Sequence, residues 1–104
     1  MENGLPSNDT LRATVTVRNP KGLHMRAAFA VAKIAGRFKS NITVRKQERA
    51  VNGKSGVSLM TLAALPGTEL VLEVAGEDGV TALPLISKAL EAPSADGLDD
   101  LLRT

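Results

Sequence analysis

Residues 11–35 read LRATVTVRNPKGLHMRAAFAVAKIA, and this stretch decides the fold. Its first part alternates apolar with polar residues, and the apolar positions are Leu11, Ala13, Val15 and Val17. A period of two is typical of a strand with one buried face. After a turn at residues 19–23, apolar residues recur every three or four positions, at Ala28, Val31, Ala32, Ala35 and Phe38. The stretch therefore predicts a strand followed by an amphipathic helix that ends near Gly36 or Arg37.

Two more strands and a short helix are predicted in the middle of the chain. Ile42 and Val44 mark the second strand, and residues 48–51 form a short third strand after a polar turn. Ser55 is a good N-cap for a short helix, because its hydroxyl can accept a hydrogen bond from a first-turn N–H group. Pro66 and Gly67 stop this helix.

The last strand and helix follow a second turn. Residues 69–74 alternate apolar and polar side chains and predict a strand, and residues 80–92 predict a helix. Pro84 has no N–H group to donate, so it is tolerated best in the first turn of a helix. We therefore expect Thr81 to serve as the N-cap, or the first turn to be distorted.

The resulting order, β-α-β-β-α-β-α, predicts an α+β fold. A four-stranded antiparallel sheet with three helices on one face, an open-faced two-layer sandwich, accommodates this order. Such a sheet leaves its other face in water, and several polar strand residues suit that face: Thr14, Thr16, Arg18, Glu69 and Glu73.

A chain of 104 residues is long enough for one domain with one core. We expect that domain to span residues 11–92. Residues 1–10 are polar and rich in helix and strand breakers, which predicts a disordered arm. Residues 93–104 are acidic and predict a mobile tail, although Leu98, Leu101 and Leu102 offer apolar side chains for docking.

Composition excludes several classes of function. The chain has no cysteine and one histidine, so we expect no disulfide, no metal site and no cofactor. No apolar run approaches the ~18 residues that span a bilayer, and the first residues do not resemble a secretion signal, which predicts a cytoplasmic protein. We also expect a monomer. Apart from Lys88 and Arg103, every Lys and Arg lies in the first 54 positions. This skew favours an acidic partner or phosphate on one side.

The single histidine, His24, lies where the turn at residues 19–23 gives way to the first helix, with Arg26 two positions on. A helix start offers unpaired N–H groups and the positive end of the helix dipole, which together with a guanidinium suit an anion held on the imidazole. Gly22 permits the tight turn before it. An isolated histidine is more often a packed or capping residue, but these surroundings favour a phosphate-handling role.

Residues 11–92 resemble the HPr family, the histidine-containing phosphocarrier proteins of the bacterial phosphoenolpyruvate-dependent phosphotransferase system. The likeness is carried by Gly-Leu-His-x-Arg at residues 22–26 and by Lys54-Ser55 at the start of the second helix. It implies that His24 accepts a phosphoryl group from Enzyme I and passes it to Enzyme IIA domains, with Arg26 stabilising the phosphate. The protein would then be a phosphoryl carrier and not an enzyme in the usual sense.

The resemblance also implies a regulatory site and a partner surface. In some bacteria the serine that matches Ser55 is phosphorylated by an HPr kinase/phosphorylase, which hinders transfer through the histidine. The partner surface implied here consists of Met25, Phe29, Lys54, Val57 and Met60. Family members commonly have proline where this chain has Ala27, and larger apolar residues where it has Gly56 and Val57. Phe29 is expected to supply part of the missing surface.

Alternative functions differ in what they require of the sequence. A nucleotide-binding P-loop fails, because Glu48 stands where the motif needs its first glycine. Nucleic-acid binding is disfavoured, because the only aromatic residues are Phe29 and Phe38, both on or at the end of a helix. A small acyl-phosphate hydrolase would turn acetyl phosphate over, whereas a carrier would not. A regulatory HPr paralogue, similar to the nitrogen-related branch and acting by protein binding, stays an alternative.

Overall fold

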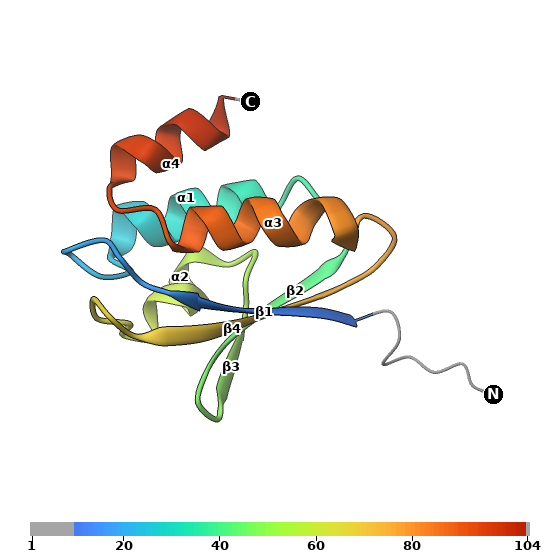
Figure 1. Ribbon diagram of the computed structural model, residues 1–104, viewed down its shortest axis with the longest axis horizontal. Helices are drawn as coiled ribbons and strands as arrows, with labels where there is room; N and C mark the ends of the chain where they lie inside the picture. The colour runs from blue at the N-terminus through green and yellow to red at the C-terminus, as the bar shows by residue number, and fades with distance from the viewer. Residues whose placement is uncertain (1–9, 104) are drawn as a thin grey trace.

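The computed structural model describes residues 10–103, and its centre is one antiparallel sheet with strand order β1-β4-β2-β3 (Figure 1). The strands are β1 (Thr10–Thr16), β2 (Asn41–Lys46), β3 (Arg49–Asn52) and β4 (Glu69–Ala75). Strand β4 pairs with both β1 and β2, so that Val15 lies opposite Leu70 and Val44 lies opposite Leu72. The predicted four-stranded antiparallel sheet is confirmed.

Four helices accompany this sheet: α1 (Met25–Ala35), α2 (Gly56–Met60), α3 (Gly79–Leu90) and α4 (Ala95–Leu102). Helices α1 and α3 lie side by side over one face of the sheet, and α2 packs against α1 (Figure 1). The α+β open-faced sandwich is therefore confirmed, with one helix more than the three expected. The additional helix, α4, lies over α1 and α3 on the side away from the sheet.

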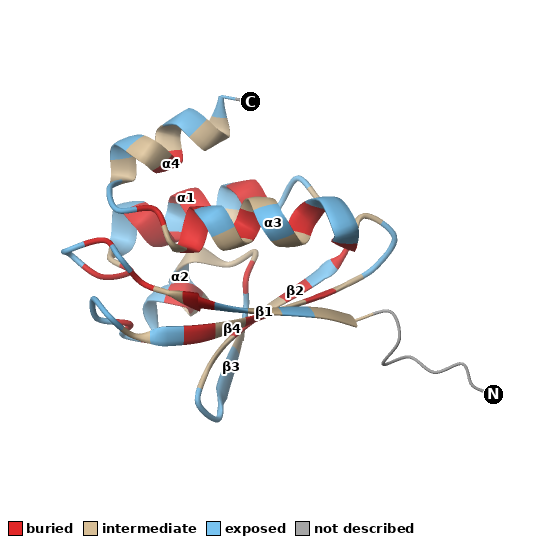
Figure 2. Ribbon diagram, in the orientation of Figure 1, coloured by how far each residue is buried: buried red, intermediate tan, exposed pale blue. Residues whose placement is uncertain are grey.

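The core lies between the sheet and the helices α1 and α3 (Figure 2). Along β4 the inward positions Leu70, Leu72 and Val74 are fully buried, as the alternating pattern predicts. Val31 and Ile34 of α1 meet them from the helical layer. Burial of each such side chain stabilises the fold by about 1.5–3 kcal/mol. The apolar face of the strands and the apolar face of α1 therefore pack against each other.

The C-terminal segment differs from the mobile tail that the sequence predicts. Ser94 caps α4 by accepting a hydrogen bond from the Gly97 N–H group, and Leu98 is only 1% exposed. Arg37, just beyond α1, donates hydrogen bonds to the carbonyl oxygens of Leu101 and Leu102 at the end of α4. The acidic composition predicted a mobile tail, but the leucines recur at helical spacing, so this segment forms an amphipathic helix that packs against the domain.

Three smaller differences concern element boundaries. The predicted arm, residues 1–10, lies outside the described residues except for Thr10, which begins β1. Helix α2 ends at Met60, short of the predicted stop at Pro66, because Ala63 adopts a left-handed φ of 50° that a helix cannot continue through. Strand β3 begins at Arg49, one residue later than expected, because Gln47 and Glu48 form the hairpin turn.

Helix α3 begins earlier than predicted, at Gly79, which places Pro84 inside it. Asp78, and not Thr81, is the N-cap residue, and its carbonyl oxygen accepts from the N–H groups of Thr81 and Ala82. The Asp78 carboxylate does not cap the helix. It accepts hydrogen bonds from the backbone N–H groups of Lys39 and Ser40 and from the Ser40 hydroxyl, and so ties the start of β2 to the start of α3.

These hydrogen bonds to the Asp78 carboxylate predict that the stability of the fold depends on pH. The hydrogen bond from the Ser40 hydroxyl, followed by that from the Lys39 N–H group, lowers the pKa of Asp78 below its ordinary value of 3.8. A carboxyl with a lowered folded-state pKa stabilises the fold fully above its unfolded pKa and loses that contribution as the pH falls through the folded value. We expect Asp78→Asn to lower the urea midpoint at pH 7 and to leave less difference from wild type at pH 3.

The neighbouring exposed carboxylate provides the control for this experiment. Glu77→Gln removes the same charge one residue away, and it should leave the urea midpoint nearly unchanged at both pH values. An Asp78→Asn variant whose deficit is the same at pH 3 and pH 7 would show that the ionised carboxylate does not stabilise the fold.

Candidate functional site

The turn before α1 is built by two local signals. The Asn19 carbonyl accepts a hydrogen bond from the Gly22 N–H group at 2.8 Å, and the Asn19 side-chain oxygen accepts from the Lys21 N–H group at 2.9 Å. Gly22 has a φ of 70°, and a Cβ atom there would lie 2.6 Å from the Ala64 carbonyl oxygen. Only glycine fits this position, where two loops meet. The turn therefore fixes the direction in which the chain enters α1.

His24 is the N-cap residue of α1, as the sequence predicts. Its carbonyl oxygen accepts the first helical hydrogen bond, from the Ala28 N–H group, but its side chain makes no capping hydrogen bond. The imidazole is thus available for chemistry, beside N–H groups of the first turn that have no partner within the helix.

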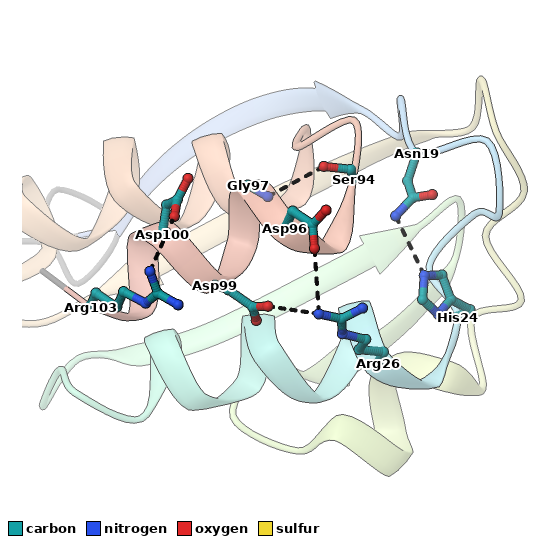
Figure 3. Close-up of polar contacts among 9 residues, drawn as sticks. All are labelled: Asn19, His24, Arg26, Ser94, Asp96, Gly97, Asp99, Asp100 and Arg103. Atoms are coloured by element: carbon teal, nitrogen blue, oxygen red, sulfur yellow. Dashed lines mark hydrogen bonds and ion pairs between the residues drawn. The ribbon is translucent and has the colours of Figure 1, made fainter.

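Asn19 lies beside the imidazole. Its side-chain nitrogen lies 3.5 Å from Nε2 of His24, at the limit of hydrogen-bonding distance, and Figure 3 shows the two side chains pointing toward each other. Asn19 is itself 6% exposed, and its oxygen is engaged by Lys21, so its amide group has little freedom. Because Asn19 faces Nε2, Nδ1 is the ring nitrogen that does not face it.

Arg26 lies in the first turn of α1, but its guanidinium is directed toward α4 (Figure 3). Its Nη2 atom lies 2.7 Å from Oδ2 of Asp99 and 3.6 Å from Oδ1 of Asp96. The arginine that the sequence assigns to phosphate is therefore paired with two carboxylates of the tail.

The beginning of α4 also forms one wall of a cleft at His24. This cleft measures about 330 Å³. Its lining residues come from the turn, from α1 and from the start of α4: Asn19, Pro20, Lys21, His24, Arg26, Pro93, Ser94, Ala95 and Asp96. The imidazole thus opens into a space bounded by two cationic side chains and by the acidic N-terminal end of α4.

Ser55 is the N-cap of α2, as predicted. Its hydroxyl accepts a hydrogen bond from the Ser58 N–H group at 3.1 Å. The neighbouring Lys54 donates through Nζ to the Phe38 carbonyl oxygen at 2.6 Å. The serine is half-buried, and the structure assigns it the capping role that its sequence position suggests.

Large apolar side chains are exposed on the adjoining faces of α1 and α2, and they include all four predicted apolar partner residues: Met25, Phe29, Val57 and Met60. The Phe29 ring covers Gly56 so closely that a Cβ atom there would lie 2.5–2.8 Å from it. A groove of about 500 Å³ brings Arg26, Phe29 and Lys54 together. Of the predicted partner residues, Phe29 and Lys54 line this groove, while Met25, Val57 and Met60 are exposed on the same two helices. We call these five residues the α1–α2 face.

Sequence reasoning missed three residues of this site. Asn19 was noted only as part of the turn, although an asparagine before proline is a turn-forming signal that could have marked it. Asp96 and Asp99 gave no such signal, because their position at the site depends on the docking of α4, which lies about 70 residues along the chain from Arg26.

This arrangement suits the transient attachment of a phosphoryl group. The site has one imidazole, donors at a helix start and an arginine in the first turn of that helix. Among residues 10–103, no group of three or more His, Cys, Asp or Glu side chains is placed to hold a metal ion. Within the same range, no helix has the length and apolarity needed to cross a membrane.

Comparison with known proteins agrees with these observations. Residues 11–92 match the family model described as the phosphorylation site of the HPr component of the phosphotransferase system. The chain is 36% identical over 87 residues to the phosphocarrier protein HPr of Neisseria meningitidis, which covers 84% of this chain and 98% of that protein.

Two solved structures are similar in fold. HPr from Bacillus anthracis superimposes with a TM-score of 0.75 at 28% identity, over 79% of this chain and 98% of that one. Crh from Bacillus subtilis, described as a catabolite repression protein and a domain-swapped dimer, superimposes with a TM-score of 0.63 at 38% identity, over 73% and 87% of the two chains.

Proposed function

The chain belongs to the HPr family of phosphocarrier proteins of the phosphotransferase system, and from this premise we propose that His24 carries a phosphoryl group from Enzyme I to Enzyme IIA domains. The protein then acts as a cytoplasmic monomer, and it leaves each cycle unchanged, as a relay and not as an enzyme with its own substrate.

The proposed transfer is a pair of displacements at phosphorus. The Nδ1 lone pair of His24 attacks the phosphorus held by Enzyme I, an N–P bond forms, and the bond between phosphorus and the donor atom of Enzyme I breaks. The Nε2 proton then leaves to water, so that Nε2 gains a lone pair and the phosphorylated ring is neutral. The Enzyme IIA acceptor then attacks the same phosphorus, the N–P bond breaks, and the imidazole regains its proton.

The observation that carries this proposal is the placement of His24. The imidazole stands at the start of α1 without capping it, and Asn19 approaches Nε2. In a neutral ring phosphorylated at Nδ1, Nε2 is an acceptor, which matches the N–H donor that Asn19 presents. The first-turn N–H groups of α1 suit the phosphoryl oxygens. Attack through Nδ1 requires the tautomer in which Nε2 carries the proton, so the contact with Asn19 fits the phosphorylated ring and not the attacking one.

We further propose that the α1–α2 face docks Enzyme I and Enzyme IIA. Exposed apolar side chains at the centre of a patch with cations at its edge are typical of a surface that meets an acidic-rimmed partner. Met25, Phe29, Val57 and Met60 provide the apolar part, and Lys54 lines the groove beside Phe29.

The test is incubation with phosphoenolpyruvate and Enzyme I of the same organism. We expect one acid-labile phosphoryl group per chain and its onward transfer to an Enzyme IIA domain. Acetyl phosphate should not be turned over. Steady release of inorganic phosphate from acetyl phosphate, or the lack of any acid-labile label from Enzyme I, would contradict the proposal.

Ser55 is proposed as a brake where an HPr kinase/phosphorylase is present. Ser55→Asp keeps an oxygen that can accept from the Ser58 N–H group, and it adds a negative charge beside the α1–α2 face. We expect stability to hold while phosphorylation of His24 by Enzyme I slows. Ser55→Ala should lose roughly 0.5–2 kcal/mol of capping without slowing transfer.

The two Ser55 variants are compared at matched concentrations of folded protein. Their rates of His24 phosphorylation separate a charge effect on docking from a capping effect on stability. Equal rates in the two variants would leave Ser55 as a helix cap alone.

A further inference from the structure

The acidic helix α4 reaches the phosphate-handling arginine from outside the β-α-β-β-α-β-α domain. It is held against the domain by the buried Leu98 and by the hydrogen bonds from Arg37, and Ser94 caps its first turn. These anchors are independent of Arg26, so they bring the carboxylates of Asp96 and Asp99 to the site whether or not Arg26 is engaged.

Asp99 is the principal partner of Arg26. Its carboxylate lies 2.7 Å from Nη2 and its side chain is 40% exposed, whereas Asp96 lies 3.6 Å away and its side chain is 90% exposed. Solvent screens the more exposed and more distant pair more strongly, so Asp96 adds little.

A phosphoryl group on His24 would compete for the same guanidinium. It carries about −1.5 to −2 charges near neutral pH and has three acceptor oxygens. Its position on His24 is two residues away from Arg26 in the sequence. Turning the guanidinium toward this group draws Nη2 away from Asp99 and weakens that contact. The carboxylate therefore stabilises the unphosphorylated state relative to the phosphorylated one.

We propose that Asp99 is a positioning residue that holds Arg26 on α4 and thereby makes phosphohistidine a better phosphoryl donor. This inference rests on the proposed function and specifies how the tail tunes it. A carrier must load from Enzyme I and unload to its acceptor, and a competing carboxylate shifts the balance toward unloading.

Asp99→Asn tests the inference. Freed from the carboxylate, Arg26 can turn to the phosphoryl group, so the equilibrium with Enzyme I and phosphoenolpyruvate should shift toward the phosphorylated chain by about two- to fivefold, the range of an exposed ion pair. Asp99→Glu, which restores the charge, should bring the equilibrium back toward wild type. Amide exchange of Leu98 verifies that α4 stays docked in each variant.

The matched control is Asp100→Asn. Asp100 is on the same helix and carries the same charge, but its nearest cation is Arg103, at 4.0 Å (Figure 3). This variant should leave the equilibrium at the wild-type value. Equal shifts in the Asp99→Asn and Asp100→Asn variants would overturn the inference, since overall charge would then explain both.

A double-mutant cycle with Arg26→Ala shows whether Asp99 acts through the arginine. The effect of Asp99→Asn should vanish when residue 26 is alanine, because no guanidinium remains to be released. An undiminished shift in that background would mean that Asp99 acts by direct repulsion, and it would overturn the positioning role.

A second readout keeps this inference separate from the proposed function. Phosphoramidate phosphorylates histidine without any protein donor, and the rate at which water then cleaves the N–P bond to give inorganic phosphate is followed by phosphorus NMR. Hydrolysis should be slower in Asp99→Asn than in Asp100→Asn. If Enzyme I fails to label the wild-type chain, the proposed function fails, while this comparison still supports or refutes the pairing of Asp99 with Arg26.

Discussion

His24→Ala is expected to take up no phosphoryl group from Enzyme I. Alanine has no lone pair to attack phosphorus, and the chain contains no second histidine to replace the imidazole. The fold should survive, because the His24 side chain makes no capping hydrogen bond and its contact with Asn19 is a long one of 3.5 Å. The acid-labile label from radioactive phosphoenolpyruvate should therefore fall to background, with circular dichroism unchanged.

Asn19→Ala is the companion variant. It removes the amide beside the ring but leaves the nucleophile, so we expect slower labelling and not its loss. An acid-labile label that survives undiminished in His24→Ala would place the phosphoryl group on another residue.

The elements of the sheet and of α1 were predictable because local and long-range preferences agree there. Alternation in residues 11–17 and 69–74 required one buried face, and the apolar spacing of α1 required a helix that covers it. His24 at the helix start followed from the same reading, since the turn signals before it are local.

The boundaries of α2 and α3 were harder to predict, because tertiary contacts decide them. The left-handed Ala63 ends the helical path near the loop whose Ala64 carbonyl oxygen accepts from the Leu23 N–H group. Asp78 heads α3 with its backbone while its carboxylate binds Lys39 and Ser40 from another loop. No window of sequence around either residue contains these partners.

Helix α4 illustrates how a functional feature escapes sequence reasoning. The spacing of its leucines was visible, but the surface that receives Leu98 exists only after α1 and α3 have packed. The pairing of Arg26 with Asp99 follows from that docking. An arginine at position 26 indicated phosphate chemistry, but the sequence did not predict that Asp99 pairs with it in the unphosphorylated chain.

Arg26→Ala is expected to slow phosphoryl transfer by about tenfold, the equivalent of one charge-assisted hydrogen bond lost in the phosphorylated state. Its melting temperature should change little, because the pair with Asp99 is exposed and such pairs contribute at most about 1 kcal/mol. The measured loss in rate is the contribution of Arg26 to the phosphorylated state minus that of its contact with Asp99, because wild-type Arg26 leaves Asp99 when it binds the phosphoryl group.

Arg26→Lys separates charge from geometry. Lysine keeps a cation but lacks the planar fork that can hold two phosphoryl oxygens, so its transfer rate should lie between those of wild type and Arg26→Ala. Stopped-flow measurement of phosphorylation and of onward transfer resolves which half of the cycle depends on the guanidinium. Rates that are equal in all three proteins would leave Arg26 as a surface residue that pairs with Asp99 and has no part in transfer.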